Sequence, residues 1–250
     1  ISTTGIQTYT GNVTLGSSTT LTAVNGTTAQ NISMENDLFG GNNSLTISGG
    51  NFALTKPTTP SVTNLAVFTF TGNAAQSFEP RAAVFASVVF ETSNSITVLD
   101  SFNVTGNVTV NNSALTLTNS AGFEQTNTTA LFTITQGSVN VGTGKFVCGT
   151  LSAASGTSFT QTGINSGTQS AQSITGDGTI NWDNENAGGT LLIGACDAGA
   201  VNFHHKHVTI NKTPITLSGI FYDLTVPALH TLNLGNNLTV TNTLTNNGSI

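Results

Sequence analysis

The 250-residue sequence predicts an all-β fold, a parallel β-solenoid (β-helix), from three observations. Apolar residues recur in short triplets around a central threonine, and turn residues separate the triplets. The resulting strands also follow one another too closely for ordinary hairpins. Together these features are typical of coils that wind around one axis.

The triplets alternate with a period of two, which places both apolar side chains on one face of a strand and the threonine on the other. Branching at Cβ lets Thr and Val pack well on a pleated surface. Each triplet is therefore expected to be a short strand. Triplets begin at Val13, Leu45, Val108, Leu115, Val208, Ile215, Leu224 and Leu238.

Turn residues set the length of a coil. Pairs such as GG, NN and NG lie between the triplets and mark turns because they tolerate positive φ. Strand starts in the last fifty residues are separated by 7, 6, 11, 6 and 6 positions; they fall at Val208, Ile215, Phe221, Leu232, Leu238 and Leu244. Sandwich hairpins need about 8 to 12 residues per strand and turn. Three strands per coil predict coils of roughly 20 residues, with a right-handed crossover.

One section departs from this pattern. Residues 56–100 contain Pro57, Pro60 and Pro80 and longer apolar runs such as LAVFTF and AAVFASVVF. We expect the solenoid to be irregular here. Because an all-β chain of this length commonly forms one domain, residues 1–250 are expected to form a single solenoid unit.

The composition argues against several classes of function. Charged residues make up 6% of the chain against a usual value of about 25%, and 5 basic residues face 11 acidic ones. This leaves no basic stripe for nucleic acid. No apolar run approaches the length of about 18 residues that a membrane helix needs. We predict neither a nucleic-acid partner nor a membrane span.

The acidic residues also argue against catalysis. Hydrolases and lyases need a carboxylate and a second acid or base on either side of the bond that is cut. Glu79, Glu91, Asp100 and Glu124 are scattered among uncharged neighbours, and Arg81 is the one arginine. The sequence therefore predicts a protein that is not an enzyme and needs no cofactor.

Two short segments are candidate metal sites, although neither supplies a complete ligand set. The segment HHKH runs from His204 to His207. His205 and His207 would project to one face of an extended chain, and imidazoles at this spacing can ligate zinc or copper. A third ligand would have to come from a neighbouring coil, and the candidates are Asp197, Asp223 and His230. The segment GDGTINWDNEN offers oxygen ligands for calcium; they are Asp177, Asp183, Asn184, Glu185 and Asn186. An exposed polar corner explains either segment equally well, so no metal is predicted.

Threonine pairs of the form Thr-X-Thr would stand on one face of a strand, as at Thr20 with Thr22 or Thr116 with Thr118. They do not recur at one fixed interval along the chain. We therefore read them as the ordinary polar residue of high β propensity.

The two cysteines, Cys148 and Cys196, are separated by 48 positions, or two coils or more. Two coil rises place their Cα atoms nearly 10 Å apart, beyond the limit of roughly 7 Å for a disulfide. Free, buried thiols are expected.

Both ends of the chain have the same pattern as its interior. If the last residues are written before the first, strand and turn continue without a break. We expect the unit to continue into neighbouring units at both ends, since neither end carries a helical or charged cap over the open strand edges. The contact is expected at Ile1, Ser2 and Thr3 on one side and at Asn247, Gly248, Ser249 and Ile250 on the other.

The segments from Gly5 to Ala23 and from Leu217 to Ile250 resemble the repeats of very large secreted bacterial adhesins, the filamentous-haemagglutinin-like and β-strand-repeat proteins. The resemblance covers about a third of the chain. It implies a parallel β-helix, export from the cell, and a role as stalk, matrix fibre or surface adhesin.

The sequence therefore predicts a non-enzymatic, extracellular structural and adhesive protein. It would form part of a filament, a stalk or a biofilm matrix fibre, with copies of itself end to end and surface glycans or other fibres as partners. Two alternatives remain: a β-sandwich pilin-like subunit that polymerises by strand donation, and a carbohydrate-binding β-helix. Because few groups titrate, stability is expected to vary little with pH.

Overall fold

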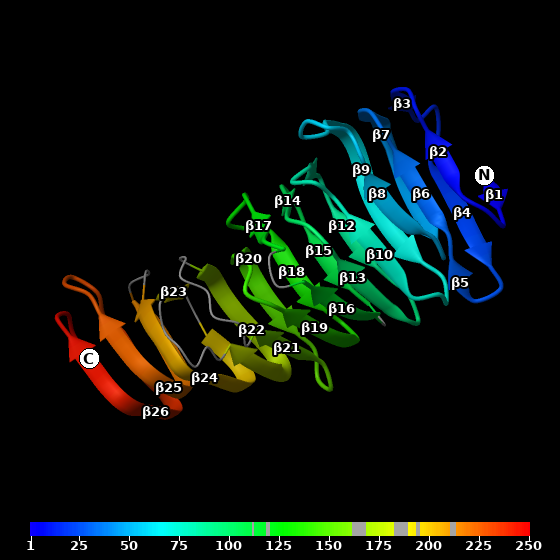
Figure 1. Ribbon diagram of the computed structural model, residues 1–250. Helices are drawn as coiled ribbons and strands as arrows, with labels where there is room; N and C mark the ends of the chain where they lie inside the picture. The colour runs from blue at the N-terminus through cyan, green and yellow to red at the C-terminus, as the bar shows by residue number, and fades with distance from the viewer. Residues whose placement is uncertain (112, 119–120, 162–168, 183–189, 194–195, 211–213) are drawn as a thin grey trace.

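A computed structural model describes residues 1–111, 113–118, 121–161, 169–182, 190–193, 196–210 and 214–250. In these ranges the chain forms 26 strands and no helix, so none of the described segments is a helix that could cross a membrane. Parallel strands stack as a β-solenoid of about 10 turns. Figure 1 shows the strands stacked along one axis, with the two termini at opposite ends. The predicted fold class is confirmed.

The strands form three faces. Face A is one ladder of parallel pairings that continues from the first coil into β24. Its members are β1 (Ser2–Thr3), β4 (Thr19–Asn25), the later part of β7 (Leu38–Ser48), β9 (Val62–Thr71), β12 (Val88–Phe90), β15 (Val108–Val110), β18 (Leu131–Ile134), the later part of β20 (Phe146–Ala153), β22 (Gln169–Trp182) and β24 (Cys196–Ile210).

Faces B and C complete each coil. Face B comprises β2 (Gln7–Tyr9), β6 (Asn31–Met34), β8 (Asn51–Leu54), β10 (Gln76–Glu79), β13 (Ser95–Val98), β16 (Ser113–Leu117), β19 (Gly137–Val141), β21 (Ser158–Gln161) and the end of β22. Face C comprises β3 (Val13–Thr14), the starts of β7 and β9, β11 (Val84–Phe85), β14 (Phe102–Val104), β17 (Phe123–Gln125), the starts of β20 and β22, and β23 (Thr190–Ile193). The long strands β24, β25 (Ile215–Val226) and β26 (Leu232–Asn246) bend through several faces in the last coils.

The register gives the length of each coil. Facing residues are 26 positions apart at Leu21 and Ile47, 20 apart at Phe70 and Phe90, and 17 apart at Ile215 and Leu232. The predicted coil of roughly 20 residues is thus confirmed as an average. The antiparallel pairing among the described strands joins β4 to the two-residue β5 (Thr28–Ala29). These parallel ladders exclude the β-sandwich alternative, which requires antiparallel hairpins.

An aromatic column fills the middle of the solenoid. The fully buried large side chains include Phe52, Phe68, Phe70, Phe78, Phe85, Phe90, Phe102, Phe123, Phe132, Phe146, Phe159 and Trp182. Ring centroids are 5.1 Å apart between Phe102 and Phe123 and again between Phe123 and Phe146. Such contacts add to the burial of apolar area, so this column is the most heavily stabilised part of the core.

Buried glutamines bind backbone carbonyls at the corners between faces. Gln76 Nε2 donates to Gly50 O at 2.8 Å, and Gln125 Nε2 donates to Gly106 O at 2.9 Å and to Leu131 O at 3.0 Å. A corner carbonyl cannot join a ladder, and burying it without a partner is costly. An uncharged amide meets this need without placing a charge in the core.

The expected irregularity at residues 56–100 lies in the corners and in the pairing of β9 with β7. Pro57 and Pro60 lie between β8 and β9, and Pro80 lies between β10 and β11, so no proline interrupts a ladder. The start of β9 shifts its register against β7 on both sides of Asn43, whereas the later strands of this section stack in constant register, as at Phe68 with Val88. Arg81, with φ of 51°, and Ala82, with φ of 59°, adopt the left-handed conformation that is unfavourable for residues with a Cβ.

Candidate functional site

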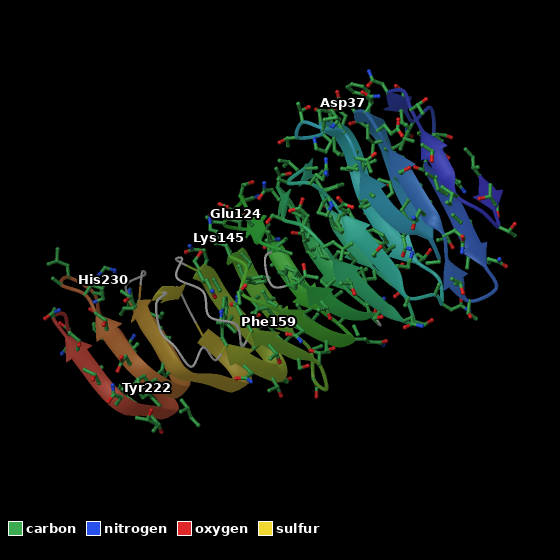
Figure 2. The ribbon with its side chains drawn as sticks, in the orientation of Figure 1. Asp37, Glu124, Lys145, Phe159, Tyr222 and His230 are labelled. Atoms are coloured by element: carbon green, nitrogen blue, oxygen red, sulfur yellow. The ribbon has the colours of Figure 1, made fainter. Side chains whose placement is uncertain are left out.

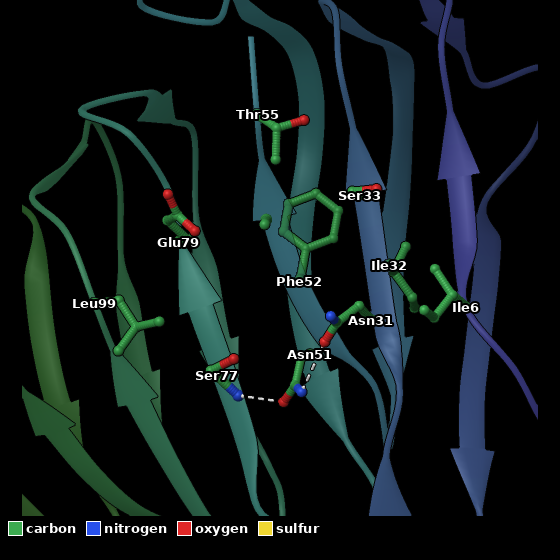
Figure 3. Close-up of a pocket in the computed structure, with 11 residues that line it drawn as sticks. Ile6, Asn31, Ile32, Ser33, Asn51, Phe52, Thr55, Ser77, Glu79 and Leu99 are labelled. Carbon is green, nitrogen blue, oxygen red and sulfur yellow. Dashed lines mark hydrogen bonds between the residues drawn. The ribbon is translucent and has the colours of Figure 1, made fainter. Parts of the chain in front are cut away.

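A hollow of about 390 Å³ lies on face B, across β6, β8 and β10. Its floor is formed by the short outward side chains of Ser33 and Ala53, which face each other in successive coils. Ala53 in turn faces Glu79 in the next coil. Ile6 and Leu99 border it on either side, with exposed fractions of 67% and 45%. The hollow therefore forms where short side chains are flanked by longer ones (Figure 3).

A chain of amide contacts crosses this hollow. Asn51 Nδ2 donates to Asn31 Oδ1 at 3.1 Å, and the Ser77 backbone N–H donates to Asn51 Oδ1 at 2.9 Å. These bonds fix the orientation of both amides. Within the described part of the chain, Asn31 Nδ2 and Ser77 Oγ have no hydrogen-bond partner. Both groups can therefore bind a ligand.

Glu79 is the charged residue that lines the hollow, and an arginine holds it in place. Arg81 Nε donates to Glu79 Oε1 at 3.4 Å, and Arg81 Nη1 donates to the Lys56 carbonyl at 3.0 Å. The Glu79 side chain is 36% exposed. The arginine thus anchors one carboxylate oxygen and leaves the other available from the hollow.

A second hollow of about 350 Å³ lies around the corner from the first. Its lining includes Thr58, Thr59, Arg81 and Asp100. Nearby, Asp37 accepts from Lys56 Nζ at 2.7 Å and from the Ser61 backbone N–H at 2.8 Å. The hydrogen bond from Lys56, followed by the one from Ser61, lowers the pKa of the Asp37 carboxyl.

The other carboxylates singled out in the sequence are distributed over several faces. Glu124 lies on face C, and its Oε2 accepts from Lys145 Nζ at 2.8 Å. Both residues are labelled in Figure 2. Glu91 follows β12 on face A. Glu79 and Asp100 are the two that the structure brings to the same region, on either side of the Arg81 corner. This grouping involves corners of successive coils, so it could not be read from sequence spacing.

The candidate metal ligands lie in the last third of the chain. His204, His205 and His207 belong to β24, and the backbone of His207 faces Asp223, but their side chains lie outside the described residues. Asp177 lies in β22, whereas residues 183–186 are outside the description. Among the described residues, no group of three His, Cys, Asp or Glu side chains is placed to hold a metal.

The cysteines lie on different faces. Cys148 is on face C, whereas the backbone of Cys196 faces Ile174, which in turn faces Leu151 on face A. The side chain of Cys196 lies outside the described residues. Cys148 is a free, buried thiol, as predicted, and its burial raises the pKa of the thiol.

Threonine pairs align in a way that the sequence did not reveal. On face A, Thr20 faces Thr46 and Thr46 faces Thr69; farther along, Thr109 faces Thr133. These threonines recur at unequal intervals in the sequence, as expected, and coils of unequal length nevertheless bring them into one ladder. Val89 interrupts the hydroxyls of this ladder.

The predicted contact residues lie at the two extreme coils. Ser2 and Thr3 form β1 against Thr22 and Ala23, and the Ile1 amino group donates to Thr20 O at 2.8 Å. At the other end, Asn247 N donates to Val226 O and Ser249 N donates to His230 O, both at 2.9 Å. Ile1 and Ile250 are 68% and 51% exposed.

The last coil leaves core positions uncovered. Leu234 and Leu244 face the buried residues Leu217 and Leu224, yet they are 64% and 48% exposed. Leu238 and Val240 are partly buried at the same end. An apolar column therefore reaches the surface here.

In the first coil, polar residues take the inward positions that leucine and valine take in the last coil. Gln7 Nε2 donates to Thr22 O at 2.7 Å and to Thr3 Oγ1 at 3.2 Å, and Tyr9 Oη donates to Gln7 Oε1 at 3.0 Å. Thr3, Gln7 and Tyr9 thus satisfy one another's hydrogen bonds. Gln7 resembles the carbonyl-binding glutamines of interior coils.

Comparison with known proteins gives no relative: the chain matches no family model, no curated protein and no solved structure.

Proposed function

We propose that the protein is a non-enzymatic, extracellular structural and adhesive protein that forms a rigid section of a filament, a stalk or a biofilm matrix fibre. The unbroken parallel ladders around a buried aromatic column are the observation that carries this proposal, because they make the solenoid a rigid rod. In its last coil, Leu234 and Leu244 are exposed in core register. Exposed apolar side chains in core register are unfavourable in water. A further coil stacked on this end would bury them and pair the open edge of β26.

A second copy of the chain can supply that coil. The inward positions of the last coil, Leu234, Leu238, Val240 and Leu244, are separated by four, two and four residues. The inward positions of the first coil show the same separations; they are Thr3, Gln7, Tyr9 and Val13. Head-to-tail stacking would therefore place the first coil of one copy on the last coil of another in register. The polar groups of that first coil are already hydrogen-bonded among themselves.

The faces support the adhesive part of the proposal. Their outward ladders are mainly hydroxyls and amides, as at Thr20, Thr46 and Thr69 on face A and at Asn31 and Asn51 on face B. Such groups give weak individual contacts that become strong when many act together along a fibre. The resemblance of both ends to adhesin repeats adds to this argument.

The experiment is a concentration series by analytical ultracentrifugation and negative-stain electron microscopy. We expect rods of uniform width that lengthen with concentration, and we expect Leu244→Asp to stop the lengthening because it places a carboxylate in the contact. Val84→Asp is the matched control, since Val84 is 44% exposed but lies far from either end. Circular dichroism checks that both variants keep their β structure.

Two results would contradict the assembly. One is a chain that stays monomeric at all concentrations. The other is equal shortening of rods by both variants, which would mean that any added surface charge opposes association.

A further inference from the structure

We propose that the hollow on face B is a binding site for a linear, neutral oligosaccharide, with Glu79 as its principal hydrogen-bond acceptor. The proposal rests on the adhesive part of the proposed function and is independent of end-to-end assembly. It assigns a chemical class of ligand to one place on the solenoid.

The charge of the hollow selects the ligand class. Glu79 is the charged residue of its lining, and the neighbouring Arg81 is already bound to Glu79 and to the Lys56 carbonyl. An anionic ligand would meet a carboxylate here without a free cation to offset it. A neutral ligand that donates hydrogen bonds fits this arrangement.

The available groups match a sugar. Adjacent hydroxyls of a sugar ring can donate to the second oxygen of Glu79, and bonds to an ionised acceptor are about twice as strong as neutral ones. Asn31 Nδ2 can donate to ring or hydroxyl oxygens, and Ser77 Oγ can donate or accept. Because Asn51 holds Asn31 and receives the Ser77 N–H, the site is organised before a ligand arrives.

The length and the borders of the hollow match a chain of sugars. From Ile6 on the first coil to Leu99 beyond β13 there are four coil rises, about 19 Å at 4.8 Å per rise. An extended oligosaccharide that crosses the strands would pass from coil to coil along this line. The C–H faces of its rings would contact the exposed aliphatic side chains of Ile6 and Leu99.

A peptide ligand is disfavoured by the backbone. Peptides commonly bind a sheet by adding a strand to an open edge. The strands under the hollow have neighbours on both sides, since β8 pairs with β6 and with β10. Recognition here must come from side chains, which favours a hydroxyl-rich ligand.

The first test titrates the 250-residue chain with cellotetraose, mannotetraose, chitotetraose and galactotetraose by isothermal calorimetry, with tetragalacturonate as an anionic comparison. We expect at least one neutral tetrasaccharide to bind with a dissociation constant below about 1 mM. Glu79→Gln should weaken it about tenfold because it removes the charge-assisted acceptor. Glu124→Gln is the matched control and should change binding less than twofold, since Glu124 also pairs with one cation and is similarly exposed.

The second test fills the hollow. Ala53→Leu adds an aliphatic side chain to its floor and should abolish binding, whereas Ala114→Leu makes the same change at an outward position of β16 and should not. The proposal is overturned if no neutral tetrasaccharide binds, if tetragalacturonate binds as well as the best neutral one, or if Ala53→Leu and Ala114→Leu bind alike.

Binding and assembly are separable in these experiments. A monomeric chain that binds a tetrasaccharide would retain this site and contradict the filament. Rods that bind no tetrasaccharide would retain the filament and overturn the site.

Discussion

Interior coils and the last coil have the same sequence pattern but differ in burial. Leu217 and Leu224 are fully buried, whereas Leu234 and Leu244, one coil later at the same ladder positions, are largely exposed. The triplets are thus equally regular in both coils. What makes a core residue is the coil stacked above it, because a single coil has no second layer to bury its own apolar face.

Buried glutamines also differ between an interior coil and the first coil. Gln125, in an interior coil, is 3% exposed and bonds to corner carbonyls and to the Gly149 N–H. Gln7, in the first coil, is 7% exposed and also bonds to a carbonyl, Thr22 O, which is only partly buried. The same residue type therefore contributes differently according to the number of coils that cover it.

The largest difference is expected from a matched pair of truncations. Phe123→Ala should lower the free energy of unfolding by about 3 to 5 kcal/mol, because Phe123 is buried between Phe102, Phe132 and Phe146. Leu244→Ala should cost less than about 1 kcal/mol, since its side chain is half exposed. Urea unfolding followed by circular dichroism measures both. Similar losses would show that the last coil is already covered in solution.

The corner glutamines are expected to give a smaller difference. Gln125→Leu should cost about 1 to 3 kcal/mol, because it leaves the partly buried Gly106 and Leu131 carbonyls and the buried Gly149 N–H without their side-chain partner. Gln7→Leu should cost less than half as much, since water can replace the amide at Thr22 O. The same urea experiment decides the order, and a larger loss for Gln7→Leu would contradict it.

The fold was predictable because its signal is local. Alternation in a triplet such as Val108–Val110 specifies which side chains point inward, and the turn residues on either side limit the coil to about 20 residues. The prolines marked an irregular section, and the strand irregularity within it lies in the pairing of β9 with β7. Pro57, Pro60 and Pro80 interrupt the sequence pattern, yet they lie in corners, where a missing N–H costs no ladder bond.

The candidate site was less predictable because it depends on register between coils. Asn31, Asn51 and Ser77 are 20 and 26 positions apart, and they meet only because those separations equal the lengths of two successive coils. No periodicity reveals a coil length that varies from 26 to 16 residues. The carboxylate of Glu79 was recognised in the sequence as one of several scattered acids, and its position beside a hollow came from the fold.

The smallest expected effect concerns pH, at a corner between two interior coils. Hydrogen bonds from Lys56 and Ser61 lower the pKa of Asp37 in the folded chain. A depressed carboxyl pKa stabilises the fold above the unfolded value of about 3.9, and this contribution is lost as pH falls through the lower, folded value. We expect the melting temperature to be nearly constant between about pH 5 and pH 8 and to fall only in more acidic buffer.

The Asp37→Asn variant isolates this carboxylate. It should melt slightly lower than the parent chain at neutral pH, because Lys56 loses its ionised acceptor, and the difference should shrink in acid as Asp37 of the parent chain becomes protonated. Scanning calorimetry across the pH range measures both curves. One partly exposed ion pair changes the melting temperature by only a small amount. A fall in the melting temperature of more than about 15 °C from neutral pH to pH 4 would therefore contradict the prediction, because it would mean that titrating groups contribute much of the stability of this sparsely charged solenoid.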